Sequence, residues 1–244
     1  MFELFIAMIE KPLVTVITVC YNAVSLIEKT IRSVLAQQYE HIEYVVVDGG
    51  STDGTIEIIR KYEAHVSHWI TEQDEGIYDA MNKGVAMATG EWCIFLNAGD
   101  TFAADDVLNR VFQVPREADV IYGDVVKNGT VKVAEPPHNS HRMYFCHQSC
   151  LTRTACLRTF PYDTSHRMSA DFKLYKLLWK KHYRFLQLPF AIANFDTTGV
   201  SNTSRSLGLY DNIRIIRELD GCLEQIRLLP RLYFVYFLCK LKNQ

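Results

Sequence analysis

Short apolar runs rich in β-branched residues alternate with helical patterns through the first hundred residues, and this rhythm constrains the fold most. Buried strands are expected at 14–19, 44–47, 67–70 and 91–96, and amphipathic helices at 25–37, 55–62 and 77–88. Strands and helices that alternate in this way form right-handed βαβ units around a parallel sheet. The sequence therefore predicts an α/β domain with helices on both faces of its sheet.

A polar cluster follows each of these four expected strands. The clusters are Tyr21 and Asn22, residues 48–53, residues 72–74 and residues 97–100. Ligands of open α/β sheets bind beyond the carboxyl ends of the strands. Four clusters in equivalent positions therefore predict one binding site at that edge of the sheet.

The segment 71–100 carries the densest chemistry of the chain. Asp74 and Gly76 open a helix, whose N-terminus is suited to phosphate. Asp79, Asn82 and Lys83 lie three and four residues apart on its polar face, where they could bind sugar hydroxyls or phosphate. Acids near a helix N-terminus and a solvated surface lysine are the alternative interpretation.

Asn97 and Asp100 follow the fourth strand. Mg²⁺ commonly binds one or two carboxylates together with substrate phosphates, and such a cation neutralises a departing nucleoside diphosphate. An Asx-type turn is the alternative for these two residues.

The segment 48–55 follows a strand and precedes a helix. It lacks the G-x-G-x-x-G spacing, which disfavours a dinucleotide-dependent hydride transfer. Asp53 is expected to cap the next helix. Asp48, at the very tip of a buried strand, is instead a candidate to accept from a base or a ribose.

The regular alternation ends after Asp100. A helix is expected at 105–112, a strand at 120–122, a hairpin at 125–133, and a buried strand around Phe145 that ends at His147 and Gln148. The following segments are a helix from about 171, a polar loop at 197–206 and two C-terminal helices. Asp171 is either a helix cap or a general base for an acceptor hydroxyl.

A zinc site built from the His and Cys residues of this region is disfavoured, because their spacing matches no common zinc motif. The residues concerned are His138, His141, Cys146, His147 and Cys150.

Composition limits the class of partner. The net charge of −2 over 244 residues offers no general basic field for nucleic acid. Seven scattered cysteines indicate reduced thiols, residues 1–11 make a poor signal peptide, and no apolar run reaches membrane-spanning length. A cytoplasmic protein is expected. The apolar and basic segment 222–242 is expected to lie on an anionic membrane surface, on the core, or on a second subunit in a homodimer.

Four segments together resemble family-two glycosyltransferases of the GT-A type. They are TVITVCYN, VVVDGGSTDGT, EQDEGIYDAMNKGVAMATGE and FLNAGD. The resemblance implies a Rossmann-like, mostly parallel sheet flanked by helices, in a domain covering 12–206. Within it, 12–100 would bind the nucleotide sugar and 101–206 the acceptor, while 207–244 would form a helical appendage.

The same resemblance implies an inverting transfer from a nucleoside-diphosphate sugar to a glycan or lipid-linked sugar acceptor, as in bacterial surface-polysaccharide synthesis. The base and ribose would contact Tyr21, Asn22 and Asp48. The diphosphate or donor sugar would contact Asp74, Gly76, Asp79, Asn82, Lys83 and Asn97. Asp100 would ligate Mg²⁺ or Mn²⁺, Asp171 would be the catalytic base, and His147 and Gln148 would line the acceptor side.

The sequence departs from the family in its metal loop, which often reads Asp-x-Asp and here begins with Asn97. A loop at 198–201 resembles one that closes over the donor, with Arg205 nearby. Two alternatives stay open. A nucleotidyltransferase would share the sheet, although its phosphate-binding loop after the first strand is missing. A non-catalytic nucleotide-sugar-binding subunit would fit the loss of the first aspartate.

Overall fold

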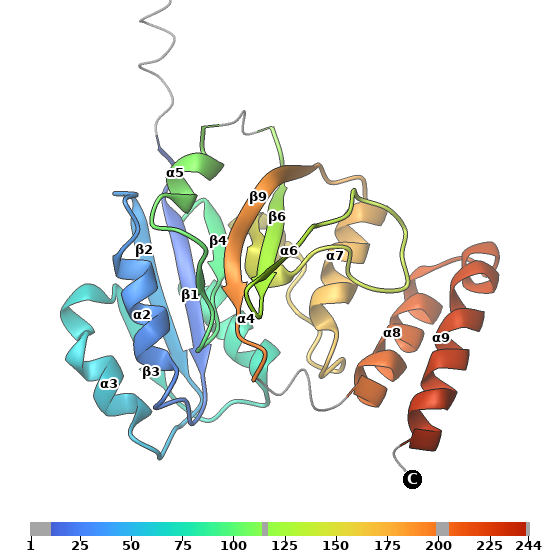
Figure 1. Cartoon of the computed structure of the whole chain (residues 1–244), viewed down its shortest axis with the longest axis horizontal. Coiled ribbons are helices and arrows are strands. Elements are labelled where there is room, and N and C mark those ends of the chain that lie inside the picture. Colours follow the sequence, from blue (N-terminus) through green and yellow to red (C-terminus); the bar gives the residue numbers. More distant parts are fainter. Residues whose placement is uncertain (1–10, 114–116, 199–204, 243–244) are drawn as a thin grey trace, which may run out of the picture.

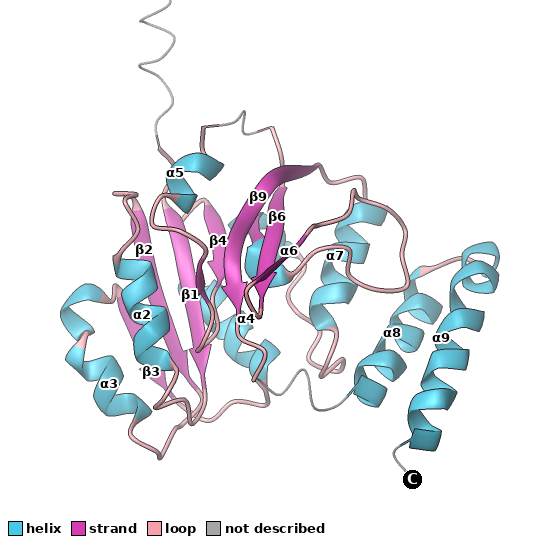
Figure 2. Ribbon diagram, viewed as in Figure 1, coloured by secondary structure: helices cyan, strands magenta, loops and turns pink. Residues whose placement is uncertain are grey.

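A computed structural model describes residues 11–113, 117–198 and 205–242, which form a curved mixed sheet between two helical layers and a C-terminal helical pair (Figures 1 and 2). The strands are β1 Val14–Cys20, β2 Ile42–Asp48, β3 His68–Thr71, β4 Trp92–Phe95, β5 Thr101–Phe102, β6 Val120–Lys127, β7 Thr130–Lys132, β8 Cys150–Arg153 and β9 Phe185–Phe195. The helices are α2 Ile27–Leu35, α3 Thr55–Lys61, α4 Ile77–Met87, α5 Val107–Val111, α6 Thr154–Thr159, α7 Ala170–Lys180, α8 Arg205–Leu219 and α9 Cys222–Lys242. Two 3₁₀ turns are η1 Glu63–His65 and η2 His147–Ser149.

The described strands form one sheet in the order β3-β2-β1-β4-β8-β6-β9-β5, and β7 pairs with β6. The first half is parallel, as the βαβ pattern predicts. The second half adds antiparallel pairings of β8 with β4 and β6, and of β5 with β9. The second half also contains a parallel ladder between β6 and β9, so the sheet is parallel in its first half and mixed in its second.

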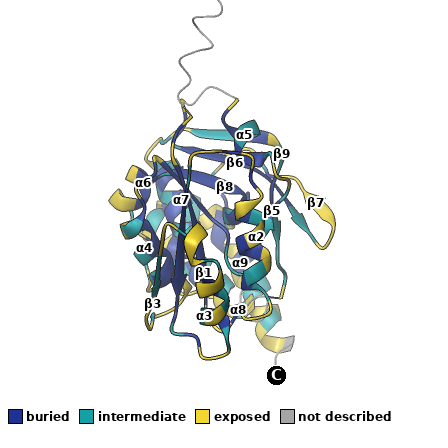
Figure 3. Cartoon of the chain, turned by 90° about the vertical axis from the view of Figure 1, so that its left-hand side faces the viewer, coloured by how far each residue is buried: buried dark blue, intermediate teal, exposed yellow. Residues whose placement is uncertain are grey.

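Two apolar layers hold the helices to the sheet, and Figure 3 shows the strands buried between them. One layer packs α2 and α5 against the sheet residues around Val16 and Ile94. The other packs α4, α6 and α7 against the sheet residues around Ile17 and Phe95. Strands buried on both faces read as continuous apolar runs, which is why β1 has no polar alternation. Gly84 lets α4 approach β1, since a Cβ there would lie 2.5 Å from Ile17 Cγ2.

The C-terminal helices α8 and α9 pack side by side beyond α7 at one end of the molecule (Figure 1). Phe172 of α7 joins Ile213 and Ile216 of α8 and Leu228 and Leu232 of α9 in a small separate core. Along the described part of the chain, no helix combines the length and apolarity needed to span a bilayer.

Several local expectations prove wrong. Phe145 lies in an irregular segment, and His147 and Gln148 form a 3₁₀ turn before β8 instead of ending a strand. The long strand β9 is absent from the sequence-based prediction. α4 ends at Met87, and Gly90 beyond it lets the chain approach β1 closely, since a Cβ there would lie 2.6 Å from Thr15 Oγ1.

Candidate active site

The polar clusters lie at the carboxyl ends of β1, β2 and β4, as the topology requires. β1 lies between β2 and β4 in parallel register, and its last residue, Cys20, pairs with Asp48. The segments after these strands therefore meet at one edge of the sheet (Figure 1). The structure brings most of the expected residues to this edge, but it gives them different tasks.

Tyr21 and Asp74 form the accessible part of the edge. Both side chains lie against Gly49, where an added Cβ would contact the Asp74 carboxylate and lie 3.4 Å from Tyr21 Cδ2. Tyr21 is 64% exposed. Asp74 Oδ1 accepts from the backbone N–H of Gly76, the residue before α4. An aromatic ring and a carboxylate on either side of a bare glycine can accommodate a flat base and its ribose.

Asp48 and Asn22 hold the loops instead of facing the edge. The Asp48 carboxylate is fully buried and accepts from the N–H groups of Gly50 and Ser51 and from the Thr71 hydroxyl. Burial raises the pKa of this carboxyl, but the hydrogen bonds outweigh it and the pKa lies below its usual range. Asn22 Oδ1 accepts from the N–H of Thr52.

The polar face of α4 is also engaged within the protein. The Lys83 ammonium donates to the Gln73 carbonyl and forms ion pairs with Glu72 at 2.9 Å and Asp79 at 3.2 Å. The Asn82 amide bonds the backbone of Tyr162 in both directions, at 2.8 and 2.9 Å. Asn82 therefore ties α4 to the loop before α7, and Lys83 fixes the turn that precedes α4.

Asp171 lies in the first turn of α7, and two side chains bind its carboxylate. His147 Nδ1 lies 3.1 Å from Oδ2, and the Tyr78 hydroxyl donates to Oδ1 at 2.8 Å. Burial raises the pKa of Asp171, but the bonds from His147 and Tyr78 lower it by more. The pKa therefore lies below its usual range, and the group is ionised at neutral pH. Since an ionised carboxylate only accepts, His147 Nδ1 carries the proton of this bond. The cap of α7 is Ser169, so Asp171 is not the helix cap.

Asp100 is the buried carboxylate after β4. Its Oδ1 accepts from the N–H of Asp196 at 2.8 Å, and the hydrogen bond from Gln148 and the nearby His147 lower the pKa of Asp100. Burial nevertheless raises the pKa of Asp100 to about 6. Asn97 Oδ1 is buried and has no hydrogen-bond partner among the described residues. A buried carboxylate and an unpartnered amide oxygen are hard oxygen donors of the kind that Mg²⁺ or Mn²⁺ binds, so this loop fits a divalent cation.

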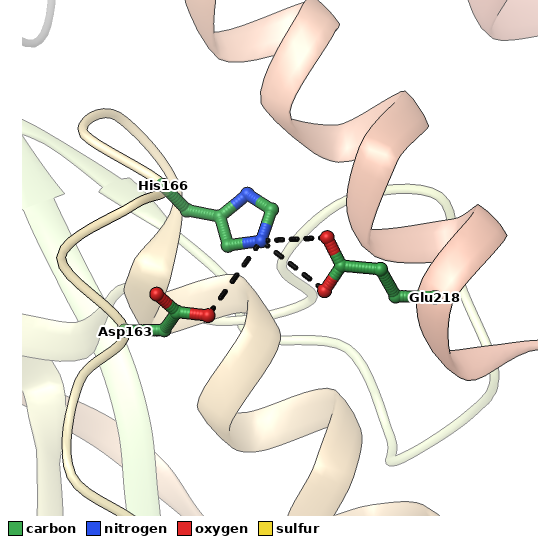
Figure 4. Close-up of side chains that lie close together, drawn as sticks. All are labelled: Asp163, His166 and Glu218. Atoms are coloured by element: carbon green, nitrogen blue, oxygen red, sulfur yellow. Dashed lines mark hydrogen bonds and ion pairs between the residues drawn. The ribbon is translucent and has the colours of Figure 1, made fainter.

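A second group of potential metal ligands lies away from this edge. Ligand atoms of Asp163, His166 and Glu218 lie within 4.8 Å of one another (Figure 4). The ammonium of Lys173 lies among them, 2.6 Å from Asp163 and 3.3 Å from His166 Nε2, and it also contacts Glu218. A lysine thus provides the positive charge here, and the group is an ion-pair network that joins α8 to α7. Elsewhere in the described residues, the His and Cys side chains of 138–150 form no converging ligand group.

Two residues of the site escaped the sequence analysis. The sequence assigns no function to Tyr78, and its place in the site follows from its hydrogen bond to Asp171. Asp196 follows β9, and a prediction of that apolar strand would have flagged it by the strand-end rule. The expected donor-closing loop lies, beyond Thr198, outside the described residues, and Arg205 is the first residue of α8.

Residues 15–187 match the profile of the family described as Glycosyl transferase family 2. The chain belongs to glycosyltransferase family 2. A PGL/p-HBAD biosynthesis glycosyltransferase of Mycobacterium bovis (strain BCG / Pasteur 1173P2) is 30% identical over 213 residues, which cover 83% of this chain and 80% of the relative. The TuaG glycosyltransferase of Bacillus subtilis (strain 168), named for teichuronic acid biosynthesis, is 42% identical over 100 residues, 39% of each chain.

Solved glycosyltransferases share the fold. A mannosyltransferase from Pyrobaculum calidifontis, in complex with GDP-Man and Mn²⁺, superposes with a TM-score of 0.68 at 20% identity, over 86% of this chain and 65% of that one. TarS 1–349 of S. aureus with UDP gives 0.65 at 20% identity, over 88% and 68%. This family-two glycosyltransferase thus has the GT-A fold with added C-terminal helices, and the nucleotidyltransferase alternative is set aside.

Proposed function

We propose that this glycosyltransferase moves a sugar from a nucleoside-diphosphate sugar to a hydroxyl of a glycan acceptor, with inversion at the anomeric carbon. The observation that carries the proposal is Asp171, an ionised carboxylate held at the site by His147 and Tyr78. The proposed mechanism forms no covalent intermediate with the protein. A single displacement needs only one base.

Asp171 accepts the proton of the acceptor hydroxyl as its oxygen attacks the anomeric carbon. The attack comes from the face opposite the departing nucleoside diphosphate, which inverts the configuration. His147 and Tyr78 fix both carboxylate oxygens, so the lone pair that receives the proton is held in one direction. His147 bonds Asp171 and also lowers the pKa of Asp100, as does Gln148. This supports an acceptor side that lies next to the donor side.

Donor binding uses the accessible edge. Tyr21 and Asp74 beside Gly49 would hold the base and ribose, and the α4 N-terminus at Gly76 would face the diphosphate. Asp100 and Asn97 would hold a divalent metal, which when bound neutralises charge on the leaving diphosphate. Five other residues at this edge support donor binding by fixing the loops, because their polar atoms already bond the protein. They are Asp48, Asn22, Asp79, Asn82 and Lys83.

The acceptor is proposed to be a lipid-linked glycan of a surface polysaccharide, and the protein to be cytoplasmic and peripheral on the membrane. The support is the naming of relatives for PGL/p-HBAD and teichuronic acid biosynthesis, together with α9. An exposed apolar stripe runs along α9 with helical spacing, formed by Leu223, Ile226, Phe234, Phe237 and Leu241. Arg227, Arg231 and Lys240 flank it, a composition typical of helices that lie on anionic lipid.

Donor binding and turnover are tested separately. A thermal-shift panel of UDP, GDP, CMP and dTDP, with and without Mn²⁺, identifies the nucleotide. Asp171→Asn is then expected to keep that thermal shift and to lose turnover by two to four orders of magnitude, roughly the usual contribution of a general base. Full activity in this variant would refute the base assignment. No shift with any nucleotide would favour an enzyme-like protein that has lost donor binding.

The membrane proposal has its own test. The double variant Phe234→Ser and Phe237→Ser is expected to weaken co-sedimentation with phosphatidylglycerol vesicles at least about tenfold, since each buried ring contributes roughly 1.5–3 kcal/mol. Val131→Ser with Val133→Ser removes similarly exposed apolar side chains in and just after β7 and should leave binding unchanged. Equal vesicle binding of both variants and the parent chain would contradict the proposal, and would leave a second subunit as the partner of α9.

A further inference from the structure

The metal loop lacks a side chain at the place where a second carboxylate would be expected. An Asp-x-Asp motif that begins at Asn97 has its third position at Gly99, so both positions of the motif lack a carboxylate here. Asp100 is one residue beyond it. A loop with only one carboxylate is a weak binder for a divalent cation, which prefers several oxygen ligands, carboxylates among them.

Asp196 fills the space of the absent side chain. An added Cβ at Gly99 would lie 2.9 Å from Asp196 Oδ2 and 3.0 Å from Asp196 Cβ. The ladder between β5 and β9 explains this contact, because Thr101 pairs with Asn194 in antiparallel register. Continuing that register places Gly99 opposite Asp196, and directly opposed residues project to the same face.

Asp196 is also joined to Asp100 itself. Its backbone N–H donates to Asp100 Oδ1 at 2.8 Å, so the main chain of Asp196 lies against the Asp100 carboxylate at the end of the ladder. Asn97 Oδ1 adds a buried oxygen without a partner among the described residues.

We propose that Asp196, from the end of β9, supplies the carboxylate that the loop after β4 has lost, and binds the divalent cation together with Asp100 and Asn97. The inference rests on the proposed function and adds a ligand to its metal site. The ligand set is thereby shared between the donor half, which ends at Asp100, and the last strand of the acceptor half. Binding of the metal then links these two parts of the chain.

Lys29 balances the Asp196 charge in the metal-free protein. Its ammonium lies 3.3 Å from Asp196 Oδ2, and its side chain is 53% exposed, against 14% for Asp196. An exposed ion pair of this kind is weak, so a cation can replace Lys29 while the lysine turns to solvent. Asp196 Oδ1 accepts from the N–H of Thr198, which keeps the carboxylate oriented.

The test is a Mn²⁺ titration of the full chain followed by the electron paramagnetic resonance signal of free Mn²⁺, without nucleotide and with saturating UDP or GDP. Asp196→Asn is expected to weaken Mn²⁺ binding at least about tenfold, because even indirect supports of a metal ligand cost 10–100-fold. Lys29→Met should bind Mn²⁺ as well as the parent chain or more tightly. Asp106→Asn, an exposed acid paired with Arg110, is the matched control.

The outcomes separate the inference from the proposed function. If Asp196→Asn binds Mn²⁺ like the parent chain and loses only thermal stability, Asp196 is structural and the inference is wrong. If the parent chain binds a nucleotide but no Mn²⁺, the inference is wrong and the transfer reaction stands without metal. If the parent chain binds neither, the proposed function fails first. Should Asp196→Asn not fold, Asp196→Ser keeps an acceptor for Thr198 without a carboxylate and takes its place.

Discussion

Removal of the Tyr78 hydroxyl should move the acid limb of the pH–rate profile. Tyr78 donates to Asp171 Oδ1 at 2.8 Å, and burial keeps the pKa of Tyr78 well above its usual value, so this hydroxyl stays protonated. A hydrogen bond to a charged group contributes roughly 1.5–3 kcal/mol. Since about 1.36 kcal/mol corresponds to a tenfold change in an equilibrium, Tyr78→Phe should raise the pKa of Asp171 and move the acid limb to higher pH by about 1 to 2 pH units.

The direction follows from the ionised form that catalysis needs. Tyr78 stabilises ionised Asp171, whose pKa lies below its usual range, so the acid limb of the parent chain lies at low pH. Without the hydroxyl, Asp171 is protonated at a higher pH and the rate falls earlier as the pH is lowered. At pH 7 both proteins should have Asp171 ionised, so their rates should differ little through this effect.

The assay is the pH dependence of kcat/KM for nucleoside diphosphate release from the donor that the thermal-shift panel identifies. Tyr162→Phe is the control, because its ring stacks on Tyr78 at 5.5 Å between centroids yet its hydroxyl makes no bond to Asp171. An acid limb that is unchanged in Tyr78→Phe, or displaced equally in Tyr162→Phe, would refute the assignment of Asp171 as the ionised base.

Three further changes test the assignment of structural roles. Asn82→Ala breaks both bonds to Tyr162 and should cost roughly 1–3 kcal/mol in the free energy of unfolding while nucleotide affinity stays the same, measured by urea denaturation and thermal shift. Gly84→Ala places a Cβ against Ile17 of β1 and should cost about 1–3 kcal/mol in the same denaturation experiment. The ion pair with Lys173 lowers the pKa of Glu218. The stability that this pair adds to the fold is therefore present above the usual carboxyl pKa and is lost as the pH falls through the lowered pKa. Lys173→Met should therefore flatten the acid side of the melting-temperature profile; an unchanged profile would show that the network contributes nothing measurable.

The first half of the fold could be predicted because its signals are local. Strands such as β1 are apolar runs of full length, and each is followed by a polar cluster that topology brings to one edge. The second half could not, because its strands take their character from partners far away in the chain. β9 includes Pro189 and polar residues among apolar ones, and its ladder with β6 shifts register near Asp124. Neither feature has a periodicity that a single sequence reveals.

The sequence indicates which polar side chains lie near this edge, but not which of them already bond other parts of the protein. Asp48 ends a buried strand and Tyr21 follows one, yet only Tyr21 is accessible, because Asp48 has backbone donors at Gly50 and Ser51 within reach. Asn82 likewise has the spacing of a ligand-binding face and bonds Tyr162 instead. A sequence shows which side chains reach the edge. Whether their polar atoms are already bonded depends on the loops that meet there.

The same distinction orders the site chemically. Buried polar atoms that are fully bonded, as in Asp48, keep the loops rigid and give a ligand nothing to bind. A buried polar atom without a partner costs free energy, and a bound ligand removes that cost by bonding it. Such an atom at a site therefore points to a ligand. Asn97 Oδ1 is such an atom, and the nearby loop carries the Asp196 carboxylate, which accepts from Thr198 and pairs with the exposed Lys29. The part of the edge that folding leaves least satisfied is therefore the part where the diphosphate and its cation are proposed to bind.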